Sequence, residues 1–504
     1  MVALRALSGL AEPGRREPLA GSLGTVTLRL YDTATRSVRP LVPLVEGTVG
    51  LYTCGPTVQA RPHVGHLRSA IALDVLHRWL LEHGLRVVFV RNVTDVDDKI
   101  IHDAAHEDEP WWALATRMTR AFTRAYDAVQ VLPPTAEPRV TGSIPSIVTL
   151  IERILERGHA YASDGDVYLA VRTAPGYGSL SGQDPDALRA SQKQVAHGHT
   201  GSKRDPLDFA LWKAAKEGEP SWPSPWGPGR PGWHIECSAM AVDHLGESFD
   251  LHAGGVDLLF PHHENELAQS RCAGHGFAQA WLHHGLVTVA GGSGGQGGSA
   301  EKMSKSLGNS TLVEQVLETT RPQVLRYALG AGHYRSPLEW SPQALSDAEA
   351  AYGRIETFVR NATDAVTGVE PGVSAASWDD FAAALDDDLG VPQALAAVHA
   401  GVRAGNALLA SRDLPALAAT LADVRRMLTV LALDPVEQWP QTGGGALSGV
   451  VDTLVDLAVE ARADARARKD WERADAVRDR LTASGIVLED TMVDGVAGVR
   501  WRLA

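Results

Sequence analysis

The pattern that most constrains the fold lies between Gly50 and Thr94, where two short apolar runs flank a loop and a longer helical stretch. Leu51 to Cys54 is expected to form a strand, about Arg68 to His83 a helix, and Val87 to Val90 a second strand. Two strands joined through a helix form a βαβ unit, whose strands run parallel. We therefore predict an α/β fold of the Rossmann type, which binds nucleotides beside the carboxyl ends of its strands.

The length of the chain predicts further domains beside this core, and its composition is that of a folded protein. The 504 residues exceed what one hydrophobic core usually serves. Hydrophobic residues make up 44% and charged residues 21% of the chain, which is typical of a protein that folds. A formal net charge of -14 argues against nonspecific binding of nucleic acid, although it permits selective binding of one RNA.

The sequence also constrains the compartment. No apolar run approaches the length of a membrane span, and no signal-peptide pattern opens the chain. The three cysteines, Cys54, Cys237 and Cys272, are too few and too scattered for a disulfide framework. We expect a cytoplasmic protein without membrane contact, whose cysteines bind a metal or a substrate or, in the case of Cys272, fill the core.

Shifts in composition divide the chain into parts. Residues 1–24 are expected to be a disordered extension, and Thr25 to Tyr31 to be the first strand. A catalytic domain is expected over residues 25–320, with an inserted region at about 115–230 that carries short strands such as Asp166 to Val171. Sheet-like patterning resumes near His234 and runs to Val289. Residues 291–299 have the composition of a flexible Gly-rich loop.

The second half of the chain is expected to be mainly helical. Ala-rich and Leu-rich helical spacing predicts a helical bundle over residues 321–433, and the Pro-rich and Gly-rich residues 434–448 are expected to form a linker. The last part, residues 449–504, is expected to form a small mixed α/β domain. It would contain one long charged helix from about Asp452 to Ser484 and short strands at Ile486 to Leu488 and Val499 to Leu503.

Two short motifs carry groups suited to phosphate chemistry. The first, Pro62 to His66, lies between a strand end and a helix start, where imidazoles can stabilise phosphate charge and Gly65 permits close approach of a nucleotide. There are two alternatives to a phosphate-binding role: two histidines three residues apart can lack a function, or they can bind a metal together. The second, Glu301 to Asn309, places Lys302 and Lys305 after the Gly-rich loop, where they can neutralise a triphosphate. Its structural alternative is a solvated turn.

Together, HVGH at residues 63–66 and KMSKS at residues 302–306, in this order, resemble the signature pair of class I aminoacyl-tRNA synthetases. The resemblance implies that an amino-acid carboxylate attacks the α-phosphate of ATP and that the acyl group then passes to RNA. It also implies that His63 and His66 stabilise the α-phosphate transition state. Lys302 and Lys305 would stabilise the β- and γ-phosphates, with Lys305 the stronger candidate.

A third group of residues has the composition of a metal site. His262 and Glu266 are four residues apart, so on one helical turn they share a face. With Cys54 and Cys237 they would offer two thiolates, an imidazole and a carboxylate, a donor set that suits zinc. The long spacing between the two cysteines is equally compatible with two buried core residues, and His263 and Glu264 are competing ligands.

The stretches LYTCGPTV at 51–58, GWHIECSAM at 232–240 and FDLHAGGVDLLFPHHENE at 249–266 closely resemble cysteinyl-tRNA synthetases. The resemblance implies one Zn2+ per chain, which would bind the thiol of the substrate L-cysteine and exclude serine. ATP with Mg2+ would be the second substrate. The zinc ligands and the substrate contacts implied by this resemblance are Cys54, Cys237, His262 and Glu266 for zinc, Thr94, Trp233 and His252 for cysteine, and Gly65, His66, Asp257 and Lys305 for ATP.

The same resemblance assigns tRNA(Cys) as the partner, with the helical bundle and a C-terminal anticodon-recognition domain as its binding regions and a monomer as the expected assembly. Arginines of the last long helix and Trp501 are suited to RNA, although interspersed carboxylates make a solvated, salt-bridged helix the stronger alternative. Departures from the family are Val64 in place of the commoner Ile, the extra residues 1–24 and the unusually long Gly-rich run.

Three further expectations remain open. Asp95, Asp97 and Asp98 are suited either to Mg2+ or, more simply, to capping a helix. A cysteine ligase of mycothiol biosynthesis resembles the same catalytic core but transfers the cysteinyl group to an amino sugar and lacks a long C-terminal extension. A noncatalytic zinc-binding and RNA-binding relic of a synthetase would not need His63, His66, Lys302 and Lys305 together.

Overall fold

The structure is a computed structural model that describes residues 27–187, 203–289, 301–302, 310–437, 439, 445–493 and 496–503. Residues 1–24, the Gly-rich loop at 291–299 and Lys305 lie outside this part of the chain, and Lys302 is described by its backbone. Among the described residues, no helix has the length and apolar content needed to cross a bilayer.

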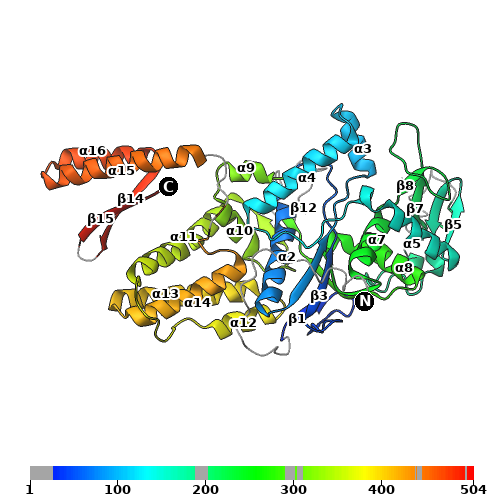
Figure 1. Cartoon of the computed structure of the whole chain (residues 1–504), viewed down its shortest axis with the longest axis horizontal. Coiled ribbons are helices and arrows are strands. Elements are labelled where there is room, and N and C mark those ends of the chain that lie inside the picture. Colours follow the sequence, from blue (N-terminus) through cyan, green and yellow to red (C-terminus); the bar gives the residue numbers. More distant parts are fainter. Residues whose placement is uncertain are drawn as a thin grey trace, which may run out of the picture.

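The centre of the molecule is a four-stranded sheet with the order β10-β9-β3-β4. All neighbouring strands are parallel, and they comprise β3 (Thr48–Thr53), β4 (Arg86–Arg91), β9 (Ser248–Gly255) and β10 (Phe277–His284). Helix α2 (Val64–Glu82) connects β3 to β4 (Figure 1). The predicted βαβ unit and the Rossmann-type fold class are therefore confirmed.

Helix α2 begins four residues earlier than its apolar periodicity predicts. His63 is in an extended conformation and its side chain accepts a hydrogen bond from the backbone N–H of Gly65, while the side chain of His66 accepts one from the backbone of His63. This reciprocal cap satisfies amides that would otherwise lack partners at a helix N-terminus. The first functional motif is thus also the start signal of the helix.

Side-chain alternation along β3 divides the interior into two cores. Leu51 packs into a cluster that contains the apolar face of α2, whereas Tyr52 packs into a cluster with α5, α7 and α8 on the opposite face of the sheet. Burial on both faces is usual for a parallel sheet, because the crossover helices cover it on both sides.

A long insertion follows β4. It comprises α3 (Asp98–His106), α4 (Trp111–Ala128), α5 (Ile144–Glu156) and an antiparallel sheet of β5 (Ala160–Ser163), β6 (Asp166–Leu169), β7 (Phe209–Ala214) and β8 (Gly229–Pro231). The side chain of Asp97 accepts a hydrogen bond from the backbone N–H of Lys99 and caps α3. The capping role expected for this acidic cluster is therefore present.

The chain returns to the central sheet through a helix. Sheet-like patterning was expected to resume near His234, but these residues form α7 (Trp233–Leu245), followed by β9, α8 (Glu264–Ala273) and β10. The strand expectation was wrong at this point. Ile235 to Ala241 are buried without interruption, and a helix that is buried all round lacks the polar face that marks amphipathic helices in a sequence.

Two smaller strand groups complete the part of the chain around the central sheet. β1 (Arg29–Asp32) and β2 (Ser37–Pro40) form a hairpin, and β1 overlaps the strand expected from Thr25 to Tyr31; Thr25 itself lies outside the described residues. β11 (Val287–Val289) pairs with β12 (Glu301–Lys302) and with β13 (Leu338–Trp340). The short helix α9 (Val313–Leu317) follows the second functional motif.

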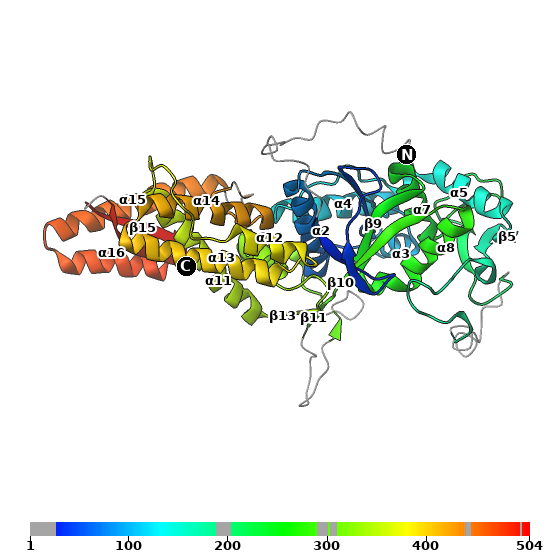
Figure 2. The same cartoon turned by 90° about the horizontal axis from the view of Figure 1, so that it is seen from below.

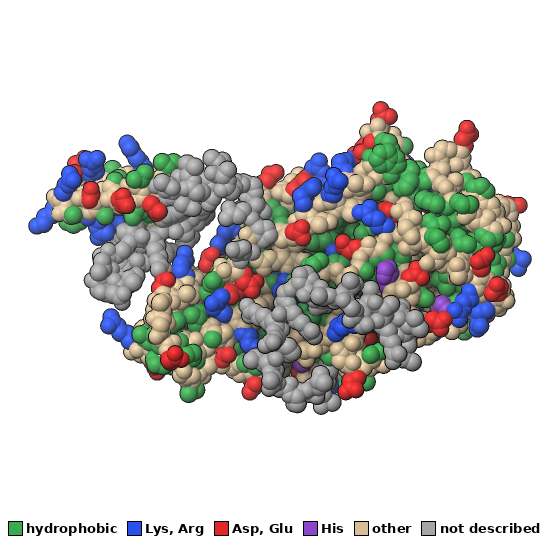
Figure 3. All heavy atoms as spheres, in the orientation of Figure 1, with side chains coloured by type: hydrophobic (Ala, Val, Ile, Leu, Met, Phe, Trp, Pro, Cys, Tyr) green, Lys and Arg blue, Asp and Glu red, His purple; other side chains and the backbone are tan. Residues whose placement is uncertain are grey.

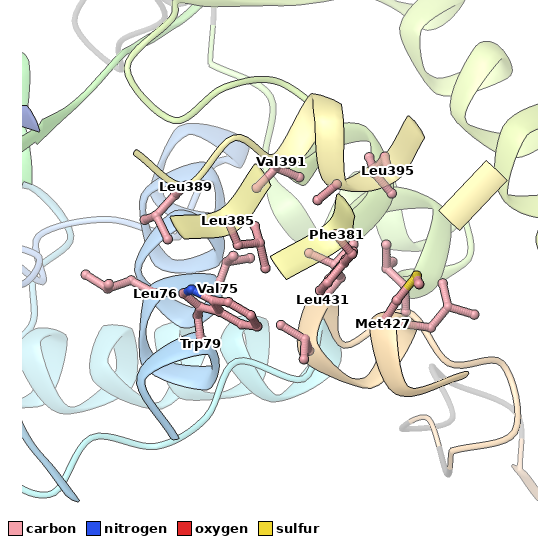
Figure 4. Packing of buried hydrophobic residues seen from close by; sticks show 14 of the residues in the cluster. Val75, Leu76, Trp79, Phe381, Leu385, Leu389, Val391, Leu395, Met427 and Leu431 are labelled. Carbon is pink, nitrogen blue, oxygen red and sulfur yellow. The ribbon is translucent and has the colours of Figure 1, made fainter. Parts of the chain in front are cut away.

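The helical region packs directly against α2. It consists of α10 (Pro322–Gly330), α11 (Pro342–Ala365), α12 (Trp378–Asp386), α13 (Val391–Ser411) and α14 (Leu414–Leu431). Figure 4 shows Trp79 of α2 close to Phe381 and Leu385 of α12 and to Leu431 of α14. Because one continuous apolar cluster joins these helices to the sheet, movement of one part strains the other.

The C-terminal segment contains two helices where one was expected. α15 (Gly445–Ala467) and α16 (Trp471–Ala483) are followed by the paired strands β14 (Ile486–Val493) and β15 (Val496–Leu503). Lys469 has a left-handed φ of 60°, and Asp470 caps α16 by accepting a hydrogen bond from the N–H of Arg473. Helical periodicity persists across this turn, which is why a single helix from Asp452 to Ser484 was wrongly expected. Figure 2 shows this segment at one end of the molecule and β5 at the other.

Candidate functional site

A cavity of about 1460 Å³ opens at the carboxyl ends of the parallel strands. Its lining includes Cys54 after β3, Gly255 at the end of β9 and His284 at the end of β10. β3 lies between β4 and β9, so the strand order changes direction here, and ligands of open α/β sheets bind at such a position. Nine of the residues predicted from sequence line the cavity: Cys54, His63, Gly65, His66, Thr94, Trp233, Cys237, Asp257 and His262.

The two histidines of HVGH form one rigid unit at the N-terminus of α2. Their rings are stacked with centroids 3.8 Å apart, and His66 also meets Phe122 of α4 edge-on. A Cβ atom on Gly65 would lie 2.9 Å from the ring of His63, so only glycine fits between the helix start and this ring. The motif therefore offers two imidazoles and the positive end of a helix to one side of the cavity.

The environment of His66 favours the neutral imidazole. Burial, followed by repulsion from His63, lowers its pKa well below the usual value. A neutral imidazole donates one hydrogen bond and carries no charge of its own. His66 can therefore contact an anionic oxygen without forming a tight ion pair in the ground state.

The second motif borders the first. The backbone of Lys302 in β12 pairs with Thr288 of β11, next to the cavity-lining Val287. Directly after the motif, the N–H of Val64 donates to the carbonyl of Thr311 and the N–H of Val313 donates to the carbonyl of Pro62, at 3.0 Å each. Backbone hydrogen bonds thus attach the segment after KMSKS to the HVGH loop. Lys305 itself lies outside the described residues.

Four side chains predicted as metal ligands converge beside the cavity. The Cys54 Sγ lies 3.6 Å from the Cys237 Sγ, 3.3 Å from His262 Nε2 and 3.2 Å from Glu266 Oε1. His262 Nε2 lies 3.0 Å from the same oxygen of Glu266. Tetrahedral ligands bound at ~2.0–2.3 Å stand roughly 3.3–3.8 Å from one another, so these four donors need only small shifts to hold one zinc ion.

The ionisable side chains of this cluster shift one another's pKa values. The contact with Cys54 lowers the pKa of the Cys237 thiol to about 6, whereas burial raises the pKa of Cys54 well above the usual value. Burial opposes ionisation of Glu266, but His252 and His262 outweigh it and hold the pKa of Glu266 well below the ordinary range. Anionic sulfur and carboxylate beside His262 form the kind of buried charge group that a divalent cation balances.

A second set of four donors overlaps the first. Cys54 and Glu266 also lie close to His252 and His263. In this set Cys237 would be unused and only one sulfur would bind. In the first set the second ring nitrogen of His262, Nδ1, lies 2.9 Å from Nδ1 of His234, an outer contact that can orient the ring of His262. Two sulfur donors and this contact favour Cys54, Cys237, His262 and Glu266.

His252 lies behind the candidate metal site. Its Nε2 is 2.9 Å from Glu266 Oε2, its ring stacks on Trp281 at 4.5 Å, and it is fully buried outside the cavity lining. The competing ligand Glu264 accepts hydrogen bonds from the backbone N–H groups of Gly178 and Ser181 and is thereby occupied away from the cluster. His252 can orient Glu266 but does not reach the cavity.

The remaining predicted pocket residues surround the candidate metal site. Trp233 is 37% exposed and packs on the ring of His262 at 4.3 Å, so it forms an apolar wall beside this site. The Thr94 hydroxyl donates to Glu236 Oε2 at 3.2 Å. Asp257 also lines the cavity, close to Gly255, and its carboxylate can accept hydrogen bonds from a ribose.

Sequence reasoning did not single out several polar residues of this region. His234 contacts His262, and His283 Nε2 lies 2.8 Å from Nδ1 of His263. Glu236 is buried, and burial followed by the charge of Cys237 raises its pKa well above the usual value. The available signal was proximity in the chain, because His234 and Glu236 shortly precede Cys237 in the quoted motif and His283 lies at the carboxyl end of a strand of the sheet.

Comparisons with known proteins agree with this geometry. The family model for the catalytic domain of class I (C) tRNA synthetases matches residues 40–350, and the DALR domain model matches residues 380–433. The cysteine–tRNA ligase of Streptomyces coelicolor is 54% identical over 498 residues, which is 97% of this chain and 78% of that protein. The cysteine–tRNA ligase of Streptomyces griseus is 52% identical over 481 residues, which is 95% of this chain and 99% of that protein.

A solved structure supports the fold. The methionyl-tRNA synthetase of Mycobacterium tuberculosis, in complex with methionyl-adenylate, has a TM-score of 0.55 to this chain. The match covers 76% of this chain and 90% of that chain at 17% sequence identity, so it bears on the architecture alone. On the identity and coverage of its sequence relatives, this chain belongs to the cysteine–tRNA ligase family of class I aminoacyl-tRNA synthetases.

Proposed function

We propose that the chain activates L-cysteine with ATP, forms cysteinyl-adenylate and transfers the cysteinyl group to the 3′ end of tRNA(Cys). The observation that carries this proposal is the single cavity that joins two groups of residues. HVGH at the start of α2 lines one part of it, and Cys54, Cys237 and His262 line another. Phosphate chemistry and sulfur recognition can therefore take place on one bound substrate pair.

We assign zinc binding to Cys54, Cys237, His262 and Glu266. When bound there, zinc supplies a soft Lewis acid that prefers the thiolate of cysteine to the hydroxyl of serine. Discrimination by shape alone is weak between these two side chains. Trp233 and Thr94 then border the space beside the site from which the amino acid would extend toward the nucleotide.

We assign the adenylation step to the two signature motifs. His63, Gly65 and His66 face the α-phosphate, which becomes more negative as the carboxylate of cysteine attacks. Lys302 and Lys305 would neutralise the charge that develops on the departing pyrophosphate, which Mg2+ accompanies. Asp257 orients the ribose. Attack breaks the bond between the α-phosphorus and the bridging oxygen, and the electron pair leaves with pyrophosphate.

We assign the binding of tRNA to the helical region and the C-terminal segment. The helical region shares its core with α2 and so holds a fixed position relative to the catalytic site. In Figure 3 the visible face of α15 and α16 carries both basic and acidic side chains, an arrangement that suits selective rather than purely electrostatic binding. We further propose that the enzyme acts as a cytoplasmic monomer, which light scattering of the purified protein would test.

Three measurements test the proposal. Cysteine-dependent exchange of pyrophosphate into ATP reports adenylation, charging of tRNA(Cys) reports transfer, and elemental analysis reports zinc. We expect both activities and about one zinc per chain. Exchange without charging would favour transfer to a small amine, as in the mycothiol ligase, and absence of both activities would refute an enzymatic role.

A further inference from the structure

His284 lines the cavity, but the proposed function gives it no role. It is the last residue of β10, it is 7% exposed, and in the register of the sheet it stands beside Gly255 at the end of β9. The preceding residue, His283, contacts His263 at the start of α8, on one face of the sheet. Because side chains alternate along a strand, the ring of His284 lies on the other face, on the side of α2.

A hydrogen bond to α2 holds this ring in place. Ser69 follows His66 by three residues on α2, it also lines the cavity, and its Oγ lies 2.6 Å from Nε2 of His284. The other ring nitrogen, Nδ1, lies 3.3 Å from the carbonyl oxygen of Gly285. A carbonyl oxygen only accepts hydrogen bonds, so Nδ1 carries the proton and Nε2 accepts from the Ser69 hydroxyl. Burial lowers the pKa of His284 to about 4, which agrees with a neutral ring.

These two hydrogen bonds leave one edge of the ring for a ligand. Both nitrogens of His284 have partners within the protein, and the carbon between them, Cε1, borders a space above Gly255. A Cβ atom on Gly255 would lie 3.5 Å from this carbon and 2.4 Å from Oδ1 of Asp257. The missing side chain of Gly255 therefore keeps open a space that has the C–H edge of a ring and a carboxylate oxygen as neighbours.

We propose that the ring of His284 binds the ribose of ATP together with Asp257, and that Ser69 is the positioning residue that orients this ring. A ribose matches the two neighbours of the space, because its hydroxyls can donate to a carboxylate and its C–H groups can pack against a ring edge. The inference rests on the proposed function and deepens it at the ATP site. Since Ser69 and His66 belong to one helix, the same hydrogen bond sets the position of the sugar relative to HVGH.

Calorimetric titration of the full-length protein with ATP, and separately with inorganic tripolyphosphate, tests the proposal in the presence of Mg2+ and without cysteine. Tripolyphosphate has the phosphates of ATP but no sugar, so it reports on the phosphate site alone. The variants are His284→Ala and Ser69→Ala, of which the second removes a single hydroxyl and preserves the fold. Thr33→Val is a matched control, because Oγ1 of Thr33 lies 2.8 Å from Nδ1 of His283 on the same strand, and neither residue lines the cavity.

For His284→Ala we expect the dissociation constant of ATP to rise by about tenfold, because the ribose loses one wall of its site. Ser69→Ala should raise it roughly threefold, because the ring remains but loses the hydrogen bond that orients it. Both variants should bind tripolyphosphate as the wild type does, and Thr33→Val should bind both ligands with wild-type affinity. In exchange kinetics, KM for ATP should rise in the two variants while KM for cysteine stays within about twofold of the wild type.

Two results would overturn the inference. Wild-type ATP affinity in both His284→Ala and Ser69→Ala would show that the ring does not touch the nucleotide. An equal loss of affinity for ATP and for tripolyphosphate would show that the substitutions distort the phosphate site and do not act on the ribose. The proposed function fails separately, since a wild-type protein that binds ATP without cysteine-dependent exchange refutes adenylation, and the same titrations still decide the role of His284.

Discussion

The proposed mechanism assigns sulfur recognition and phosphate recognition to different parts of one cavity, so single side chains should have separable roles. Cys237 is 2% exposed and lies within the four-donor cluster, whereas Cys272 is fully buried in the core, where burial raises its pKa to about 12. The lysines of KMSKS belong to the phosphate part of the proposed mechanism. Substitutions in the two parts should therefore change different kinetic constants.

Replacing Cys237 with Ser should remove one sulfur donor from the candidate metal site. We expect zinc content to fall well below one per chain and KM for cysteine to rise by at least about tenfold, because the substrate thiol loses its partner. Elemental analysis and exchange kinetics measure both effects. Cys272→Ser is the control and should keep its zinc; an unchanged zinc content in Cys237→Ser would contradict the ligand assignment.

Replacing Lys305 with Ala should slow adenylate formation by about 10²-fold or more, because a charge that stabilises the departing pyrophosphate is lost. The affinity for cysteine should stay within about twofold of the wild type, since the proposed mechanism places the amino acid beside the candidate metal site and not at KMSKS. Single-turnover kinetics separate the two quantities. An equal loss of cysteine affinity would argue against a role confined to phosphate.

At the scale of elements, the orientation of α2 depends on a buried ion-pair network. Asp74 of α2 accepts hydrogen bonds from Arg78, from Arg326 of α10 and from the backbone of Leu132. Burial opposes its ionisation, but Arg78 and Arg326 outweigh that effect and lower the pKa of Asp74 to about 2. Because His63 and His66 lie at the start of the same helix, this network connects the helical region to the catalytic motif.

Asp74→Asn should destabilise the protein by about 3–5 kcal/mol, because it leaves buried Arg326 without its counter-charge. A carboxyl whose folded pKa lies below its unfolded value stabilises the folded state above the unfolded pKa, near 3.8, and loses this contribution as the pH falls toward 2. Urea titrations at pH 7 and pH 3 measure the difference. Asp127→Asn, on the exposed face of α4, is the control, and an equal effect of both substitutions would contradict this account.

At the scale of the whole molecule, the C-terminal segment forms its own structural unit. Helix α15 packs on α16, α16 packs on β14, and β14 pairs with β15. The helical region is different, because its core is continuous with that of the catalytic sheet. The two parts assigned to tRNA binding should therefore respond differently to truncation.

Truncation after Leu433 should leave cysteine-dependent pyrophosphate exchange within about twofold of the full-length value, because the cavity and its supporting helices remain. Charging of tRNA(Cys) should fall by about 10²-fold, since contacts far from the reaction position the RNA. Parallel assays of pyrophosphate exchange and tRNA charging, on the truncated and the full-length protein, measure the two effects separately. A truncated protein that charges tRNA as well as the full chain does would show that the C-terminal segment is not an RNA-binding region.

The sequence by itself determined the features that depend on neighbouring residues. The βαβ unit followed from apolar runs a few residues long, and the proximity of His262 to Glu266 followed from their spacing of four residues. Local signals failed where helical periodicity continued across the turn at Lys469, and where the continuously buried stretch from Ile235 to Ala241 of α7 lacked a polar face. The HVGH and KMSKS motifs indicated the class I synthetases, and the stretches at 51–58, 232–240 and 249–266 indicated the cysteinyl family.

Only the tertiary structure decided which distant residues meet. Cys54 and Cys237 are 183 positions apart, yet their sulfur atoms lie 3.6 Å apart because α7 packs across the carboxyl end of β3. The contacts of Tyr52 with His252, of His234 with His262 and of Asp74 with Arg326 have the same origin. Periodicity specifies the face of an element that a side chain occupies, but its partner depends on how two elements pack, and this is set by the whole core.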